Sequence, residues 1–195
     1  MSLMDMIGKV VGGENAISAI AQQLGVNPAL AQSAIAAAVP MIVGGLAKNT
    51  AKPGGAAALD GALARHDGSI LDDLVGALGN SSTSTDGGNI LGHILGNRRG
   101  AVEQGVAQKS GIDLGTIAKL LPILAPIVMG ALGKAKREQG LDASGVASVV
   151  DATHAQAQAE AGGSNPLLSI LDADHDGQLD VGDLSAGLDL LKKLT

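Results

Sequence analysis

An all-α fold is predicted for this chain of 195 residues, and three observations support the prediction. Apolar residues recur at the helical spacing of three and four positions, as in Leu3, Met6, Ile7, Val10 and Val11. Residues that favour helix starts and ends flank several such segments. No segment alternates apolar and polar residues for more than a few positions, as a half-buried strand would. We therefore expect helices and no sheet.

The second and third helices of this prediction are bounded by their capping residues. A helix over about 14–24 ends at Gly25, because glycine readily adopts the left-handed conformation that follows a helix end. The next helix begins with Asn27 as N-cap and Pro28 at the first helical position. Pro40 lies inside this helix, and we expect a kink there because proline removes a backbone hydrogen bond.

The same pattern occurs twice in the chain. With an offset of 86 residues the chain aligns with itself, for example Gly25 with Gly111, Ile35 with Leu121, Pro40 with Pro126 and Gly44 with Gly130. A helix over about 100–110 is then followed by a long one that Asp113 caps and Pro126 kinks. We expect two similar helical units, 1–80 and 89–150, joined by a Ser-, Thr- and Gly-rich linker at 81–88 and packed as a pseudo-two-fold pair.

Composition excludes several kinds of site. The chain has 29 Gly but no Phe, Trp, Tyr or Cys. Without aromatic rings there is no stacking platform for single-stranded nucleic acid and no aromatic cage for a quaternary amine. Without cysteine there are no disulfides, thiolate metal sites or Cys nucleophiles.

Glycines inside helices are expected to permit close helix approach, and glycine pairs between helices are expected in linkers. The first group comprises Gly8, Gly44, Gly45, Gly76 and Gly92. The second group comprises Gly54-Gly55, Gly87-Gly88 and Gly162-Gly163, which lack the residues of a phosphate-binding loop.

The N-terminal segment and the most apolar segments indicate where in the cell the protein is expected. Asp5 stands where a signal peptide would carry a basic and then an apolar region, so we expect a cytoplasmic protein or one exported without a classical signal peptide. The most apolar stretches, 34–47 and 120–133, are shorter than the about 18 to 20 residues that span a bilayer. We interpret them as core helices and expect no membrane partner.

A calcium site is the strongest chemical signal, and it lies near the C-terminus. The segment 172–183 matches an EF-hand calcium loop, with acids at positions 1, 3, 5, 9 and 12 and Gly177 at position 6. Hard cations such as Ca²⁺ take six to eight oxygen ligands, which closely spaced carboxylates supply. The predicted ligands are Asp172, Asp174, Asp176, Gln178 through its backbone carbonyl, Asp180 and Asp183.

Two features distinguish this segment from a full EF-hand. Position 12 is Asp183 rather than glutamate, so the site should bind more weakly and admit Mg²⁺ more readily. Asn165-Pro166 leaves only a short entering helix, so the segment is as similar to a dockerin-type loop as to an EF-hand. We expect a linker at 151–164 and a calcium loop followed by a helix at 165–195.

A helix-turn-helix is the alternative functional signal. The turn at Gly25 and the small and aliphatic residues around it fit a DNA-binding turn, but Gln32 is the one long polar group on the following helix. Basic residues cluster only at Arg98-Arg99 and at 134–137, so we expect a packing turn and no nucleic-acid partner.

Enzymatic chemistry is not expected. The four histidines lack the spacing to a base or nucleophile that catalysis requires, and we interpret them as surface residues: His66, His93, His154 and His175.

The first three quarters of the chain resemble a known family. Five segments carry the likeness: the start at 1–6, the turn at 21–26, the helix end at 39–46, Pro53-Gly54-Gly55 and the segment 89–96. Over about residues 1–150 the chain is similar to a bacterial family of uncharacterised proteins related to YidB. The resemblance implies an all-helical fold of homeodomain-like topology in a bacterial protein, and it assigns no activity or catalytic residue.

These observations favour a non-enzymatic structural or interaction protein that binds Ca²⁺ in its C-terminal segment. DNA binding is the alternative function. The sparse charge of the helices, 16% of residues overall, predicts a homo-oligomer or a protein partner.

Overall fold

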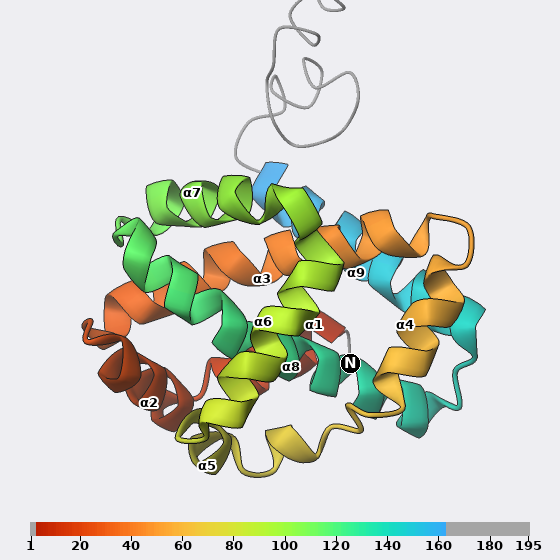
Figure 1. Cartoon of the computed structure of the whole chain (residues 1–195), viewed down its shortest axis with the longest axis horizontal. Helices are drawn as coiled ribbons and strands as arrows, with labels where there is room; N and C mark the ends of the chain where they lie inside the picture. Colours follow the sequence, from red (N-terminus) through yellow and green to blue (C-terminus); the bar gives the residue numbers. More distant parts are fainter. Residues whose placement is uncertain (1–2, 163–195) are drawn as a thin grey trace, which may run out of the picture. The chain divides into compact units, whose positions relative to one another are not determined.

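Helices form every regular element of the residues that the structure describes, 3–162 (Figure 1). The structure is a computed structural model, and it confirms the all-α prediction over this range. In chain order the elements are α1 (Leu3–Val11), α2 (Glu14–Leu24), α3 (Pro28–Thr50), α4 (Gly55–Leu63), the 3₁₀ turn η1 (Ser69–Leu71), α5 (Leu74–Leu78), α6 (Ser81–Leu95), the 3₁₀ turn η2 (Gly96–Arg98), α7 (Arg99–Ser110), α8 (Leu114–Gln139) and α9 (Ala143–Gly162).

The chain divides into two units by its internal contacts, 1–154 and 155–195. The described part of the second unit is the end of α9, where Gln156 Nε2 donates a hydrogen bond to Glu160 Oε1 at 3.0 Å. The first unit contains the helices α1 to α8 and residues 143–154 of α9, and we call it the helical body.

Both copies of the repeat have the helix boundaries that their capping residues predict. Gly25 and Gly111 follow α2 and α7 with φ of 70° and 72°, the left-handed conformation expected of a helix end. Asn27 Oδ1 accepts from the backbone amide of the residue three positions on at 2.8 Å, and Asp113 Oδ1 does so at 3.0 Å. The predicted caps are therefore confirmed. A cap can be predicted from sequence because it depends only on the capping residue and on the adjacent helical turn.

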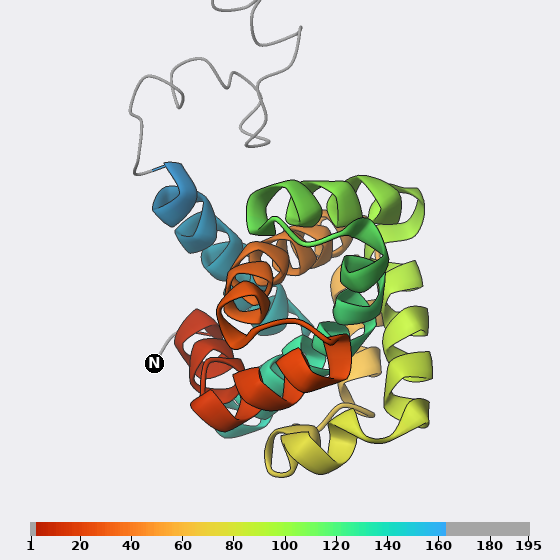
Figure 2. The ribbon, with the colours of Figure 1, turned by 90° about the vertical axis from the view of Figure 1, so that its left-hand side faces the viewer.

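The core of the helical body centres on α8. This helix packs against α6, α3, α7 and α1, and α6 crosses it (Figures 1 and 2). Several of its side chains are fully buried, among them Leu120, Leu121 and Leu124. α3 and α8 continue through their internal prolines, Pro40 in α3 and Pro122 and Pro126 in α8.

Within residues 3–162, two helices, α3 and α8, are long and apolar enough to cross a membrane by length and composition alone. They extend beyond the apolar stretches 34–47 and 120–133 at both ends. In the structure 50% of the most apolar window of α3 is buried and 67% of that of α8. Core helices of soluble proteins pass the same test of length and composition.

The segments expected as linkers are helical where the structure describes them. Residues 81–88 form the first turns of α6, with Asn80 Oδ1 accepting from the Ser82 amide at 3.0 Å as the N-cap. Residues 151–162 continue α9. Serine, threonine and glycine favour turns in isolation, but a capped start and the burial of Gly87 against α8 favour the helix in the folded chain.

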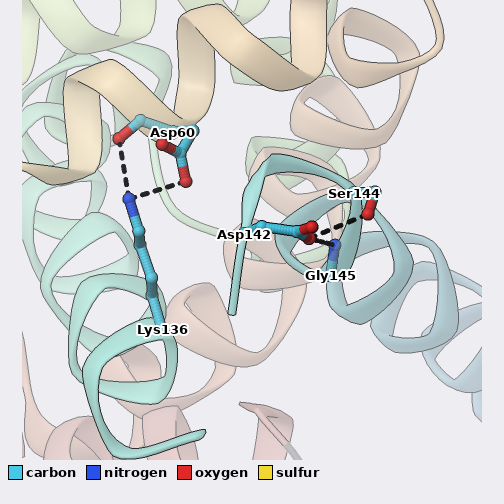
Figure 3. A network of polar contacts seen from close by, with 5 residues as sticks. All are labelled: Asp60, Lys136, Asp142, Ser144 and Gly145. Carbon is cyan, nitrogen blue, oxygen red and sulfur yellow. Dashed lines mark hydrogen bonds and ion pairs between the residues drawn. The ribbon is translucent and has the colours of Figure 1, made fainter. Parts of the chain in front are cut away.

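Two polar contacts fix the end of α8 and the start of α9 (Figure 3). Lys136 Nζ lies 2.6 Å from Asp60 Oδ1 and donates to the Asp60 carbonyl at 3.3 Å, which ties α8 to α4. Asp142 Oδ1 accepts from the Gly145 amide and from the Ser144 hydroxyl, both at 2.8 Å, and so caps α9. These hydrogen bonds lower the pKa of the Asp142 carboxyl below its usual value.

Candidate functional site

The metal ligands predicted from the sequence lie outside the residues that the structure describes. They are Asp172, Asp174, Asp176, Gln178, Asp180 and Asp183. Within residues 3–162, no group of three or more His, Cys, Asp or Glu side chains lies close enough to hold a metal ion. The calcium site therefore stays a prediction from the spacing of these six residues.

The helical body contains a polar pocket of about 320 Å³. Its wall is made by the segment that joins α4 to α5, by the first turns of α6 and by Pro126 of α8. Seven polar side chains line it: Arg65, His66, Asp67, Ser69, Ser82, Thr83 and Asp86.

Glycines of α8 let the pocket-forming segment approach the helix backbone. A Cβ on Gly133 would collide with the carbonyl oxygen of His66, and one on Gly130 would lie 2.6 Å from Cγ2 of Ile70. Gly68 has a φ of 95° and presses on the same helix, because its own Cβ would lie 3.0 Å from the Gly130 carbonyl oxygen. This close approach positions the neighbouring His66 beside α6.

His66 and Asp86 face each other in the pocket. Nδ1 of His66 lies 3.9 Å from Oδ2 of Asp86, and the two side chains are 17% and 51% exposed. The two groups form an ion pair only when the imidazole is protonated. No base was expected beside His66, and Asp86 was expected in a linker; the two side chains come together because residues 81–88 fold as part of α6.

Asp67 and Ser82 of the pocket wall make polar contacts within the chain. Asp67 Oδ1 accepts from the Ser69 amide at 3.0 Å, and its Oδ2 lies 3.7 Å from Nη1 of Arg137. The hydrogen bonds from Ser69, and then the Arg137 charge, hold the pKa of the Asp67 carboxyl below its usual value. Ser82 donates its hydroxyl to Asn80 Oδ1 at 2.9 Å. These contacts stabilise the pocket wall.

Most of the basic residues that could contact DNA phosphates are instead paired with carboxylates of the same chain. Arg99 Nε lies 2.8 Å from Glu103 Oε1, and Lys136 and Arg137 pair with Asp60 and Asp67. The predicted turn is present between α2 and α3, and Gln32 is exposed on α3. A paired cation has less attraction for phosphate, since the carboxylate already compensates its charge.

Comparison with curated proteins and with solved structures found no match for this chain. A family model described as a bacterial protein of unknown function (DUF937) matches residues 5–135. This span covers well over half of the chain and includes α2 through most of α8. The chain therefore belongs to this bacterial family of unknown function.

Proposed function

We propose that the protein binds Ca²⁺ through its C-terminal segment and acts as a non-enzymatic structural or interaction protein. One observation carries the proposal: acids at positions 1, 3, 5, 9 and 12 of the segment 172–183, with Gly177 at position 6. Calcium loops need this spacing because oxygen ligands must converge on one ion while the chain turns sharply at the glycine. Within the family, we further infer a relation to YidB from the segments that resemble it.

Charge supports calcium as the ligand of the segment. The formal net charge of the chain is −6, and five aspartates fall within these twelve residues. Carboxylates so close together repel one another, and a divalent cation removes the repulsion. A short ligand at Asp183 predicts a dissociation constant of about 10⁻⁵ to 10⁻³ M, weaker than that of a sensor EF-hand.

Titration calorimetry on the full chain tests the proposal. We expect a saturable heat with Ca²⁺ and a weaker one with Mg²⁺. Replacing Asp172 and Asp176 together by Ala should abolish this heat. The matched control replaces two aspartates of the pocket, Asp67 and Asp86, by Ala, which changes the net charge equally and should leave the heat unchanged. No saturable heat at about 1 mM Ca²⁺ would overturn the proposal.

We also infer that duplex DNA is not the partner. The ion pairs of Arg99, Lys136 and Arg137 support this inference, since these residues form most of the two basic clusters. A gel shift at two salt concentrations tests it. Binding below micromolar concentration at about 150 mM salt, with a steep salt dependence, would favour the helix-turn-helix alternative instead.

Self-association is the remaining part of the proposal. Among the described residues, Val75 and Leu114 are large apolar side chains with more than a third of their surface exposed, at 58% and 45%. Sedimentation equilibrium with and without Ca²⁺ gives the mass of the particle. A mass of 19.1 kDa at high concentration in both conditions would contradict the expected homo-oligomer.

A further inference from the structure

His154 of α9 packs against Gly44 in the second half of α3. A Cβ on Gly44 would lie 3.0 Å from Cε1 of His154 and 3.3 Å from its Nδ1, so the missing side chain at Gly44 makes room for the imidazole. Val146, Val150 and Thr153 of α9 are also buried in the structure. His154 therefore belongs to the side chains by which residues 143–154 pack on the rest of the helical body.

The buried edge of this imidazole has no hydrogen-bond partner. Nδ1 of His154 is buried and makes no hydrogen bond, whereas the ring as a whole is only partly buried. A neutral imidazole needs a proton on one nitrogen only, and the tautomer protonated on Nε2 leaves Nδ1 without a hydrogen. Protonation would add an N–H at Nδ1, where the packed helices offer it no acceptor.

Two charged groups act on His154 from the helices packed there. Lys48 lies on α3, one turn after Gly44, and Asp151 lies on α9 itself. Burial, and then the Lys48 charge, lower the pKa of the imidazole below its usual 6.5, while Asp151 acts in the opposite direction. The net effect favours the neutral ring in the packed structure.

We propose that His154 is an acid-sensitive latch whose protonation releases residues 143–154 of α9 from α3 while the rest of the helical body stays folded. Above about pH 6.5 the ring is neutral in both the docked and the released form, and docking is at full strength. As the pH falls below this value, the released form takes up a proton before the docked form does. Docking therefore weakens with acid. This inference does not depend on the calcium proposal.

Amide hydrogen exchange of the full chain, corrected for the intrinsic effect of pH, tests the latch. Between about pH 7.5 and about pH 5.5 we expect a severalfold loss of protection over 143–154 and little change in α6. Each unit by which the docked pKa lies below the released one corresponds to a factor of about 10 in the docking equilibrium. His154→Leu and His154→Gln should remove this pH dependence. His93→Gln, at an exposed histidine of α6, is the matched control and should keep it.

Two results would overturn the proposal. One is equal protection of 143–154 at both pH values in the unmodified protein. The other is a pH-dependent loss that persists in both His154 variants. If neither variant folds, an NMR titration of the His154 ring in the unmodified chain decides, and a midpoint at or above about 6.5 would contradict the latch.

Discussion

Gly87 of α6 lies directly against the carbonyl oxygen of Pro122 in α8. In an α-helix this carbonyl would accept the amide proton of the residue four positions on, which is Pro126 and has no N–H. The contact therefore covers a carbonyl that α8 leaves without its usual donor. The hydrogens on the α-carbon of Gly87 are the groups that approach it. A side chain at position 87 would force the two helices apart.

Gly87→Ala should destabilise the protein by about 1–3 kcal/mol or more, because the added methyl group meets backbone that cannot move aside. Gly88→Ala is the matched control, since a Cβ there meets nothing within 4 Å. It should leave stability unchanged or raise it by up to about 1 kcal/mol, as alanine favours helix. Urea unfolding of both variants measures the difference, and similar midpoints would contradict the assigned contact.

Asn49 joins the end of α3 to the end of α6. Its Nδ2 donates to the carbonyls of His93 and Ile94, both at 2.8 Å. Asn49→Asp has nearly the same shape but faces the two carbonyls with a carboxylate, so it should cost about 1–3 kcal/mol. Asn97→Asp, at an exposed position just after α6, should cost much less. Thermal unfolding at neutral pH measures both, and equal losses would show that the two hydrogen bonds contribute little.

The pair of Lys136 and Asp60 should contribute more than the pair of Arg137 and Asp67. The first pair is 2.6 Å apart with side chains 24% and 30% exposed, whereas the second is 3.7 Å apart with side chains 61% and 51% exposed. Lys136→Met should cost about 1–2 kcal/mol, because it leaves the Asp60 carboxylate partly buried without its cation. Arg137→Met should cost less than about 0.5 kcal/mol.

A double-mutant cycle with Asp60→Asn checks the Lys136 effect. The loss in the double variant should be smaller than the sum of the two single losses, because either change alone breaks the pair. Additive losses in urea unfolding would mean that Lys136 acts through packing of its aliphatic chain rather than through Asp60.

The N-caps at Asp113 and at the equivalent Asn27 should differ in pH dependence, because only the aspartate titrates. Asp113 caps α8, and the hydrogen bonds from Thr116 lower the pKa of its carboxyl below the usual 3.8. Its contribution to stability is complete above this value and is lost as the pH falls through the lowered pKa. Asp113→Asn should remove this part of the pH dependence between about pH 5 and about pH 2.

Asn27 at the start of α3 provides the comparison. Its amide does not titrate, so Asn27→Ala should cost about 1 kcal/mol at every pH. Measuring the urea unfolding midpoints of both variants at several pH values tests these two expectations. If Asp113→Asn loses as much stability in acid as the unmodified protein, other carboxyls such as those of Asp67 and Asp142 account for the loss.

The sequence by itself determined the helical class and the helix boundaries of both repeats. Gly25 and Gly111 end their helices, and Asn27 and Asp113 begin the next ones, as predicted. These features depend on the backbone preference of one residue and on the turn beside it, so they can be predicted without knowing the fold. The six predicted calcium ligands also come from spacing alone and stay a prediction.

Only the tertiary structure decided which glycines permit close packing. Gly44 and Gly45 meet other helices as expected, whereas a Cβ on Gly8 or Gly92 would meet nothing within 4 Å. Gly87, expected in a linker, instead meets the backbone of α8. Every glycine has the same lack of a side chain, and its importance depends on which atom from a distant part of the chain lies opposite. The proximity of Asp86 to His66 has the same origin, because it arises only once residues 81–88 fold as a helix.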